Sequence, residues 1–205
     1  MKINVGIFIF NDVEILDFTG PYEVFSSARL SSKVLNKSNI DEIYKRPSPF
    51  KVFTISEKNK PIVTTGGLKV ISDYNFINTP RIDILLLPGG KGTRKLLGNK
   101  EVISWIKRKK KLDLILSVCT GSLLLATAGL LKNKKASTHW STESLLKEIS
   151  PSTKVTKKRF TLDTIYSSAG VSSGIDLSLK VVEQYFGNTV AKNTAKYMDY
   201  KVNKN

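Results

Sequence analysis

The stretch that most constrains the fold is residues 112–131, LDLILSVCTGSLLLATAGLL. A continuous apolar run over residues 112–118 predicts a buried strand, and the chain's single cysteine, Cys119, follows it directly. Thr120 and Gly121 then make a tight turn into an apolar helix. Several hydrolase folds use a strand, a small-residue turn and a helix to lift a nucleophile clear of the sheet. The pattern therefore predicts a nucleophile elbow at Cys119.

Two interpretations of Cys119 follow from this position. At a helix N-terminus, the partial positive charge of unpaired N–H groups favours thiolate over thiol, which predicts a reactive cysteine. A free cysteine is also among the most frequently buried residue types and then acts as a small core hydrophobe. The tight turn favours the reactive interpretation. Because one cysteine allows no intramolecular disulfide, we expect a reducing compartment, the cytoplasm.

The order of elements predicts an α/β fold with an open, mostly parallel sheet and helices on both faces, a flavodoxin-like three-layer sandwich. Strand-like runs lie at residues 3–10, 50–55, 82–87, 112–118, 154–160 and 163–168. The segment PIVTTGGLKVIS, residues 61–72, predicts a hairpin around its glycine pair. With 205 residues, 40% of them hydrophobic, we expect a single domain over residues 1–205.

The charge balance is strongly basic. The chain has 33 Lys and Arg against 17 Asp and Glu, a net charge of +16, which favours anionic partners and raises the question of nucleic-acid binding. The lysines are spread along the chain, and the densest run, KRKKK at residues 107–111, is predicted to be the solvated last turn of a surface helix. No recognition helix, zinc spacing or aromatic-rich basic strand is present. We therefore expect a basic surface without specific nucleic-acid recognition.

Membrane segments, metals and cofactors are not expected. The apolar N-terminal run MKINVGIFIF has no small-residue cleavage site, so it predicts a core strand and not a signal peptide. No segment approaches the roughly 20 apolar residues that a membrane crossing needs. No group of His, Cys, Asp and Glu has metal-ligand spacing, and PGGKGT lacks the dinucleotide-binding pattern.

Two acids flank a predicted helix start. Thr19 is a candidate cap and Pro21 would lie in the first turn, where its missing N–H costs little. Asp17 would precede this helix and Glu23 would lie in its first turn, so both would stand at the sheet edge where open α/β folds bind ligands. The alternative is that both acids only complement the helix dipole.

A second candidate loop follows the apolar run of residues 82–87 and consists of Pro88, Gly89 and Gly90. Glycines at the carboxyl end of a strand let backbone N–H groups point into a cleft. Attack by a thiolate on an unsaturated carbon creates negative charge that needs donors. The N–H groups of Gly90 and Thr120 are candidates if the two strands are neighbours. Taken alone, the glycine pair is more typical of an ordinary tight turn.

The single histidine, His139, lies in the segment ASTHW. A cysteine and a histidine are a common pair for activating a nucleophile, so His139 is a candidate partner for Cys119. A lone histidine next to Trp140 is equally consistent with a structural role. The distance between the two side chains decides between these alternatives.

Several motifs occur in a fixed order: ILDFTGPYEVF, LLLPGG, SVCTGSLLLATAGLL, ASTHW and SSAGVSSGIDLSL. Together they resemble the ThiJ/PfpI superfamily, which shares the class I glutamine-amidotransferase-like fold. The resemblance covers nearly the whole chain and is strongest to the isonitrile hydratase branch and to the ligand-binding domains of AraC-type regulators. It also implies a homodimer.

The resemblance implies a role for each motif residue. Cys119 matches the nucleophile, and Asp17 matches the acid that stands where other members place a glutamate beside the cysteine. Thr120 matches the residue after the nucleophile, and Gly90, with Gly89 before it, matches the glycine whose N–H faces the site. Peptidase-like members have a histidine after the cysteine, so Thr120 argues against a protease.

The activity that the resemblance implies is hydration of a small-molecule isonitrile, R–NC, to an N-substituted formamide. The Cys119 thiolate would attack the terminal carbon while Asp17 shuttles the proton, and water would release the product. Two alternatives belong to other classes. One is a non-catalytic domain that senses a ligand or stress, and the other is a protective enzyme that acts on glyoxals or glycated groups.

Overall fold

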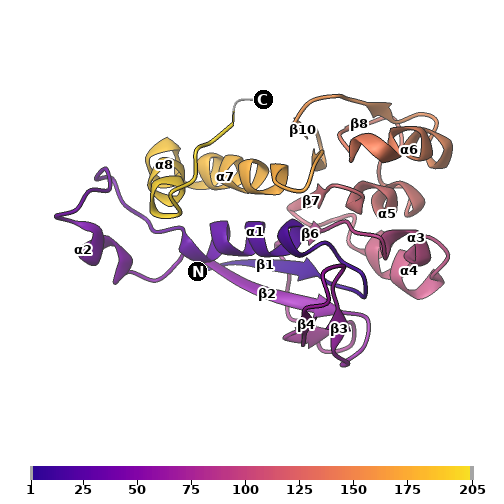
Figure 1. The fold of residues 1–205 in the computed structure, drawn as a ribbon, viewed down its shortest axis with the longest axis horizontal. Coiled ribbons are helices and arrows are strands. Elements are labelled where there is room, and N and C mark those ends of the chain that lie inside the picture. The colour runs from indigo at the N-terminus through magenta and orange to yellow at the C-terminus, as the bar shows by residue number, and fades with distance from the viewer. Residues whose placement is uncertain (1, 204–205) are drawn as a thin grey trace.

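Strands and helices alternate along the chain (Figure 1). The structure is a computed structural model that describes residues 2–203. The strands are β1 (Ile3–Phe8), β2 (Phe50–Ser56), β3 (Ile62–Val63), β4 (Lys69–Val70), β5 (Tyr74–Asn75), β6 (Ile84–Leu87), β7 (Leu114–Val118), β8 (Lys135–Ala136), β9 (Lys154–Val155), β10 (Phe160–Leu162) and β11 (Tyr166–Ser168). The helices are α1 (Ile15–Ser27), α2 (Ile40–Tyr44), α3 (Thr93–Leu96), α4 (Lys100–Arg108), α5 (Gly121–Thr127), α6 (Glu143–Ile149), α7 (Ser173–Phe186) and α8 (Asn188–Tyr197), with a 3₁₀ turn, η1 (Trp140–Thr142), before α6.

The main sheet has the strand order β10-β11-β7-β6-β1-β2-β5. Its pairs are parallel except for β10 with β11, so the predicted open, mostly parallel sheet is confirmed. Strands β3 and β4 pair antiparallel and form the predicted hairpin. The strand predicted over residues 154–160 is wrong, because the backbone bends at Lys158 and Arg159, between β9 and β10. That bend sends β9 to pair with β8 and β10 to pair with β11.

Helices cover the sheet in two groups. In Figure 1, α1, α7 and α8 lie together on one face, and α3, α4 and α5 form the second group, with α6 packed against α5. Every residue of β6 and β7 is buried, which explains why these strands read as unbroken apolar runs. The segment that contains α2 projects away from the rest of the molecule (Figure 1).

Helix α1 begins four residues earlier than the sequence pattern predicts. It starts at Ile15, so Asp17 lies in its first turn and Pro21 lies inside the helix. Thr19 caps nothing, because its Oγ1 donates to the carbonyl of Ile15 across 2.8 Å. The start of the helix is fixed by another segment instead, since the N–H of Glu14 donates to the carbonyl of Gly89 across 2.9 Å.

The basic run at residues 107–111 lies where the sequence predicts it. Lys107 and Arg108 form the last turn of α4, whose inner face buries Trp105. The ammonium group of Lys109 lies 4.9 Å from the centre of the Trp105 ring, a cation–π contact. None of the helices within residues 2–203 has the length and apolar character that crossing a bilayer requires.

Candidate active site

Cys119 stands at the junction of β7 and α5. Its φ of +55° is in the left-handed region, which is rare for a residue with a side chain and marks a tight, strained turn. The Cys119 N–H donates to the carbonyl of Ser168 across 3.0 Å. At Gly121, a Cβ atom would lie 2.0 Å from the carbonyl oxygen of Leu87, so only glycine lets α5 start this close to β6. The predicted strand, turn and helix are therefore confirmed.

Two buried hydroxyl groups hold the carbonyl of this strained residue. Ser122 Oγ donates to the Cys119 oxygen across 3.2 Å, and Thr138 Oγ1 lies 3.3 Å from the same atom. The two hydroxyls also hydrogen-bond each other across 2.7 Å. Sequence reasoning missed both residues, since a threonine 19 positions after the cysteine carries no local signal. They fix the elbow so that its strain does not relax into another backbone conformation.

Asp17 meets the cysteine from α1. Its side chain is fully buried, and Oδ2 accepts the N–H of Gly89 across 2.8 Å. Oδ1 is buried and has no hydrogen-bond partner among residues 2–203. The Cys119 thiol lies close enough to this carboxyl for each group to shift the pKa of the other. The structure thus brings together the two residues that the sequence analysis paired.

Burial controls the proton affinities of this pair. It raises the pKa of Asp17 to about 7, against the lowering effect of the Gly89 N–H, and the charge of Glu14 raises it further. Burial also raises the pKa of the Cys119 thiol to about 12, and the charge of Asp17 adds to that rise. Burial and the Asp17 charge thus oppose the thiolate that a helix N-terminus favours, and they favour a shared proton on the pair. The reactive interpretation of Cys119 stays a prediction.

The glycine loop after β6 meets the elbow because β6 and β7 are neighbours, with Leu87 beside Ser117. The Gly90 N–H does not point into an open cleft, as the sequence suggested, because it donates to Thr120 Oγ1 across 3.0 Å. Thr93 supports this contact, with its Oγ1 2.8 Å from the Gly90 carbonyl and 3.1 Å from Thr120 Oγ1. Thr93 is fully buried and was not anticipated.

Because the Gly90 N–H is already bonded, the backbone N–H of Thr120 is the candidate donor left for the Cys119 sulfur. Its N–H hydrogen-bonds the Cys119 sulfur and lowers the pKa of the thiol, although less than burial raises it. Gly89 is packed tightly against this donor. A Cβ atom on Gly89 would lie 2.5 Å from the Thr120 nitrogen and 2.9 Å from Asp17 Oδ2. The glycine pair is thus more than an ordinary turn, because it lets the acid, the donor and the cysteine approach one another.

Two predicted candidates make their hydrogen bonds to other residues. His139 Nδ1 is 2.8 Å from Ser141 Oγ and caps the 3₁₀ turn η1, and none of the interactions described for Cys119 involves it. Glu23 is exposed and bonds Ser27 on the same helix. Among the residues that the structure describes, no group of three or more His, Cys, Asp or Glu side chains is arranged to hold a metal ion.

Glu14 is an acid that the sequence analysis did not single out. It is half-buried just before α1, and its charge raises the pKa of both Asp17 and Cys119. The only sequence signal was its place three residues before Asp17. That spacing becomes informative once helix α1 is known to begin at Ile15, because both acids then lie at the start of the same helix. Glu14 keeps the pair in its protonated form over more of the neutral range.

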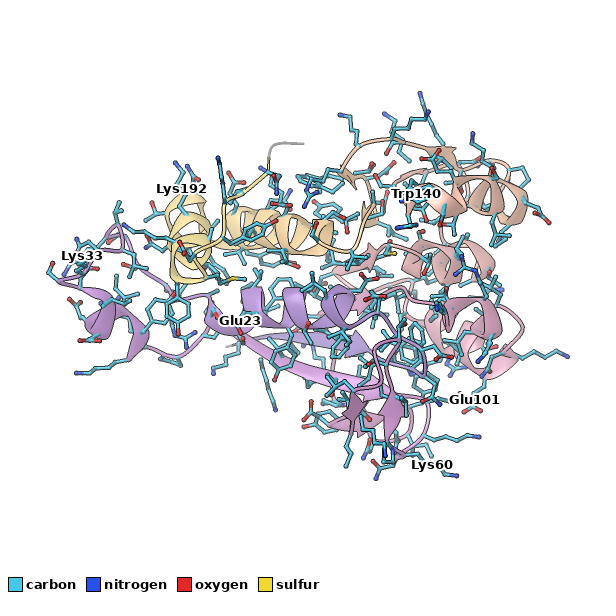
Figure 2. The ribbon with its side chains drawn as sticks, in the orientation of Figure 1. Glu23, Lys33, Lys60, Glu101, Trp140 and Lys192 are labelled. Carbon is cyan, nitrogen blue, oxygen red and sulfur yellow. The ribbon has the colours of Figure 1, made fainter. Side chains whose placement is uncertain are left out.

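A cavity of about 370 Å³ borders the elbow. It is lined by Thr138, Trp140, Glu143, Thr156, Lys157, Ala169 and Gly170. Two of these residues touch the elbow, because Thr138 bonds the Cys119 carbonyl and Ala169 follows Ser168 directly. Trp140 is 78% exposed, and Figure 2 shows it in the region of β8 and α6, whereas Glu23 lies on the α2 side of α1.

A sequence profile described as the DJ-1/PfpI family matches residues 3–184. The chain belongs to the DJ-1/PfpI family. This membership confirms the resemblance inferred from the ordered motifs, and the fold agrees with it. A ThiJ/PfpI family protein from Pseudomonas syringae superposes with a TM-score of 0.84 at 24% identity, covering 100% of this chain and 77% of that one.

Characterised relatives of this DJ-1/PfpI chain fall into more than one functional class. The isonitrile hydratase of Pseudomonas putida is 27% identical over 202 residues, which is 98% of this chain and 79% of the hydratase. The HTH-type transcriptional regulator GbdR of Pseudomonas aeruginosa is 24% identical over 149 residues, 72% of this chain but only 41% of the regulator. The family thus includes an enzyme and a regulator that both resemble this chain.

Proposed function

We propose that this protein hydrates isonitriles to N-substituted formamides, so that R–NC and water give R–NH–CHO. The observation that carries the proposal is the buried Cys119 thiol beside the Asp17 carboxyl, whose pKa of about 7 suits proton transfer in both directions. The similarity to the Pseudomonas putida isonitrile hydratase over nearly the whole chain supports it.

The first step adds the thiol across the terminal carbon of the isonitrile. The carbon lone pair takes a proton from the Asp17 carboxyl, which makes the carbon electrophilic, and Asp17 is reprotonated by the Cys119 thiol. The sulfur then forms the S–C bond, giving the neutral thioimidate R–N=CH–S on Cys119. The Thr120 N–H stabilises the sulfur while it carries negative charge. This step needs no permanently charged thiolate and so agrees with the raised thiol pKa.

The second step releases the product. Asp17, protonated at the end of the first step, gives its proton to the substrate nitrogen and takes one from the water that attacks the thioimidate carbon, which leaves R–NH–CH(OH)–S on Cys119. The C–S bond then breaks as Asp17 gives this proton to the sulfur, and Asp17 takes the hydroxyl proton as the carbonyl of the formamide forms. One water molecule is consumed, and both residues return to their starting protonation states.

We place the R group of the substrate in the cavity that borders the elbow. Its largest apolar wall is Trp140, and an exposed indole offers a flat face on which an aromatic ring can stack. Glu143 and Lys157 on the rim would accept polar substituents. The proposal therefore favours aryl over short alkyl isonitriles. The homodimer and the cytoplasmic location expected from the sequence stay predictions.

The test compares wild type with Cys119→Ala and Cys119→Ser. Each purified protein is incubated separately with an aryl isonitrile and with methylglyoxal, and formamide and lactate are quantified. We expect formamide from wild type only and no lactate from any of them. Matching urea-unfolding curves would show that the variants fold. Formamide production by folded Cys119→Ala would refute the proposal, and lactate from wild type would favour the glyoxal-directed alternative.

Ligand sensing without turnover is the second candidate. The high pKa of the Cys119 thiol and the similarity to the regulator GbdR favour it. It predicts saturable binding of an isonitrile or formamide, seen by tryptophan fluorescence, with no product formed by wild type. The same samples therefore separate the two functions.

A further inference from the structure

A second cavity, of about 300 Å³, lies at the opposite end of β7 from Cys119. It is lined by Lys110, Leu112, Asp113, Ile115, Gly129, Leu130, Lys132, Lys134, Thr164 and Ile165. Leu112 and Asp113 come just before β7, whereas Cys119 directly follows that strand. A five-residue strand spans about 17 Å, so a ligand here would not touch the proposed active site.

Two basic segments converge on this cavity. Lys110 comes from the run that ends α4, and Lys132 and Lys134 come from the turn after α5. More exposed cations lie next to them along the chain: Lys107, Arg108, Lys111 and Lys135. The sequence analysis treated the run at residues 107–111 as a solvated helix end, and the tertiary structure adds a second group of lysines beside it.

The lining lysines form no close ion pair. Of the ion pairs formed within residues 2–203, none includes Lys110, Lys132 or Lys134, although the charge of Lys134 helps to lower the pKa of Asp163. Asp113 is the one acid in the lining. The nearby Asp163 is already engaged, since its carboxylate accepts the backbone N–H groups of Lys135 and Thr164 across 2.9 and 2.6 Å. Positive charge therefore exceeds negative charge in the cavity.

We propose that the cavity lined by Lys110, Lys132 and Lys134 binds a compact anion with two or more phosphate groups, such as a diphosphate or triphosphate. Lysine ammonium groups are common phosphate ligands and act as point charges without the fixed geometry of arginine. The cavity volume lies at the lower end of the range for small-molecule sites, which suits a compact ligand better than an extended nucleic-acid backbone. The site is independent of isonitrile hydration.

The experiment titrates inorganic tripolyphosphate into the protein by isothermal titration calorimetry at fixed ionic strength. It compares wild type with the triple variant K110Q/K132Q/K134Q and with the control K37Q/K45Q/K51Q. The control removes the same charge from exposed lysines in and beside the segment that contains α2, which Lys33 marks in Figure 2. We expect the cavity variant to bind about tenfold more weakly or worse, and the control less than about twofold.

Further arms decide the nature of the ligand. Inorganic monophosphate should bind about tenfold more weakly than tripolyphosphate, because it contacts fewer lysines. Equal losses in the two triple variants would show a net-charge effect and overturn the proposal, as would tighter binding of a short DNA duplex than of tripolyphosphate. Urea unfolding of each variant shows whether it is folded. The single variant K132Q provides a milder change if the triple variant fails to fold. Because binding is measured without isonitrile, the result does not depend on the proposed function.

Discussion

Gly89 donates its backbone N–H to Oδ2 of Asp17 across 2.8 Å and so joins the loop after β6 to helix α1, 72 residues earlier in the chain. The contact holds one carboxyl oxygen and leaves the other, Oδ1, buried without a hydrogen-bond partner among residues 2–203. It depends on a position without a side chain, because a Cβ atom on Gly89 would collide with both Asp17 and Thr120. One backbone donor therefore orients the proton-transfer group of the proposed reaction.

Gly89→Ala is expected to lower isonitrile turnover by about 100-fold or more, because the added methyl group must displace the carboxyl or the Thr120 N–H. The measurement is kcat/KM for formamide production. Gly98→Ala is the matched control, since a Cβ atom there meets no atom within 4 Å. Equal activity of the two alanine variants would contradict the role of this contact.

Asp17→Asn is expected to have two separate effects. Turnover should fall between about 100-fold and 10,000-fold, because the proton shuttle is lost. The pKa of the Cys119 thiol should fall as well, since the Asp17 charge no longer raises it. Iodoacetamide alkylation measured against pH reports the thiol pKa. The exposed Asp41→Asn serves as control, and an unchanged or higher thiol pKa in Asp17→Asn would argue against coupling of the pair.

The contribution of Asp17 to protein stability is expected to fall as pH rises from about 4 to about 7. The pKa of Asp17 is about 7 in the folded protein against an ordinary value of 3.8, so the folded state binds this proton more tightly. The stabilisation is complete below the ordinary pKa and is lost as pH rises through the folded one, by at most about 4 kcal/mol.

Urea unfolding of wild type and Asp17→Asn across this pH range isolates the contribution of Asp17. The free energy of unfolding of wild type should drop relative to that of the variant between pH 4 and pH 7, because asparagine does not titrate. Parallel profiles for the two proteins would show that the carboxyl is not held protonated by burial.

Trp140→Ala is expected to reduce kcat/KM for aryl isonitriles roughly 3- to 10-fold while changing the value for alkyl isonitriles less than about twofold. Trp140→Phe should retain most of the aryl preference. Val34→Ala, which also shortens an exposed apolar side chain, is the control. The chain has two tryptophans, and Trp105 is only 3% exposed, so ligand-induced fluorescence changes report on Trp140 even without turnover. An equal loss for both substrate classes would contradict stacking.

Local sequence signals were enough for much of the fold. The apolar runs predicted β6 and β7, because a strand buried on both faces is apolar at nearly every residue. The glycine pair predicted the hairpin of β3 and β4, because a tight turn needs only a few residues of a suitable type. The same local rules failed at α1, where a threonine, a glycine and a proline suggested a start at Thr19. The helix begins at Ile15 because the Gly89 carbonyl accepts the Glu14 N–H, a contact that no local pattern reveals.

The sequence by itself determined the open, mostly parallel sheet, the elbow at Cys119 and the pairing of Asp17 with that cysteine. Only the tertiary structure decided what shifts the pKa values of the pair, because each pKa depends on burial and on charges from other segments. It also decided that Gly90 bonds Thr120, that His139 faces Ser141, and that lysines from two distant segments share one cavity. Each of these contacts depends on the distance between segments that lie far apart along the chain. Folding determines that distance, and the spacing of residues in the sequence does not.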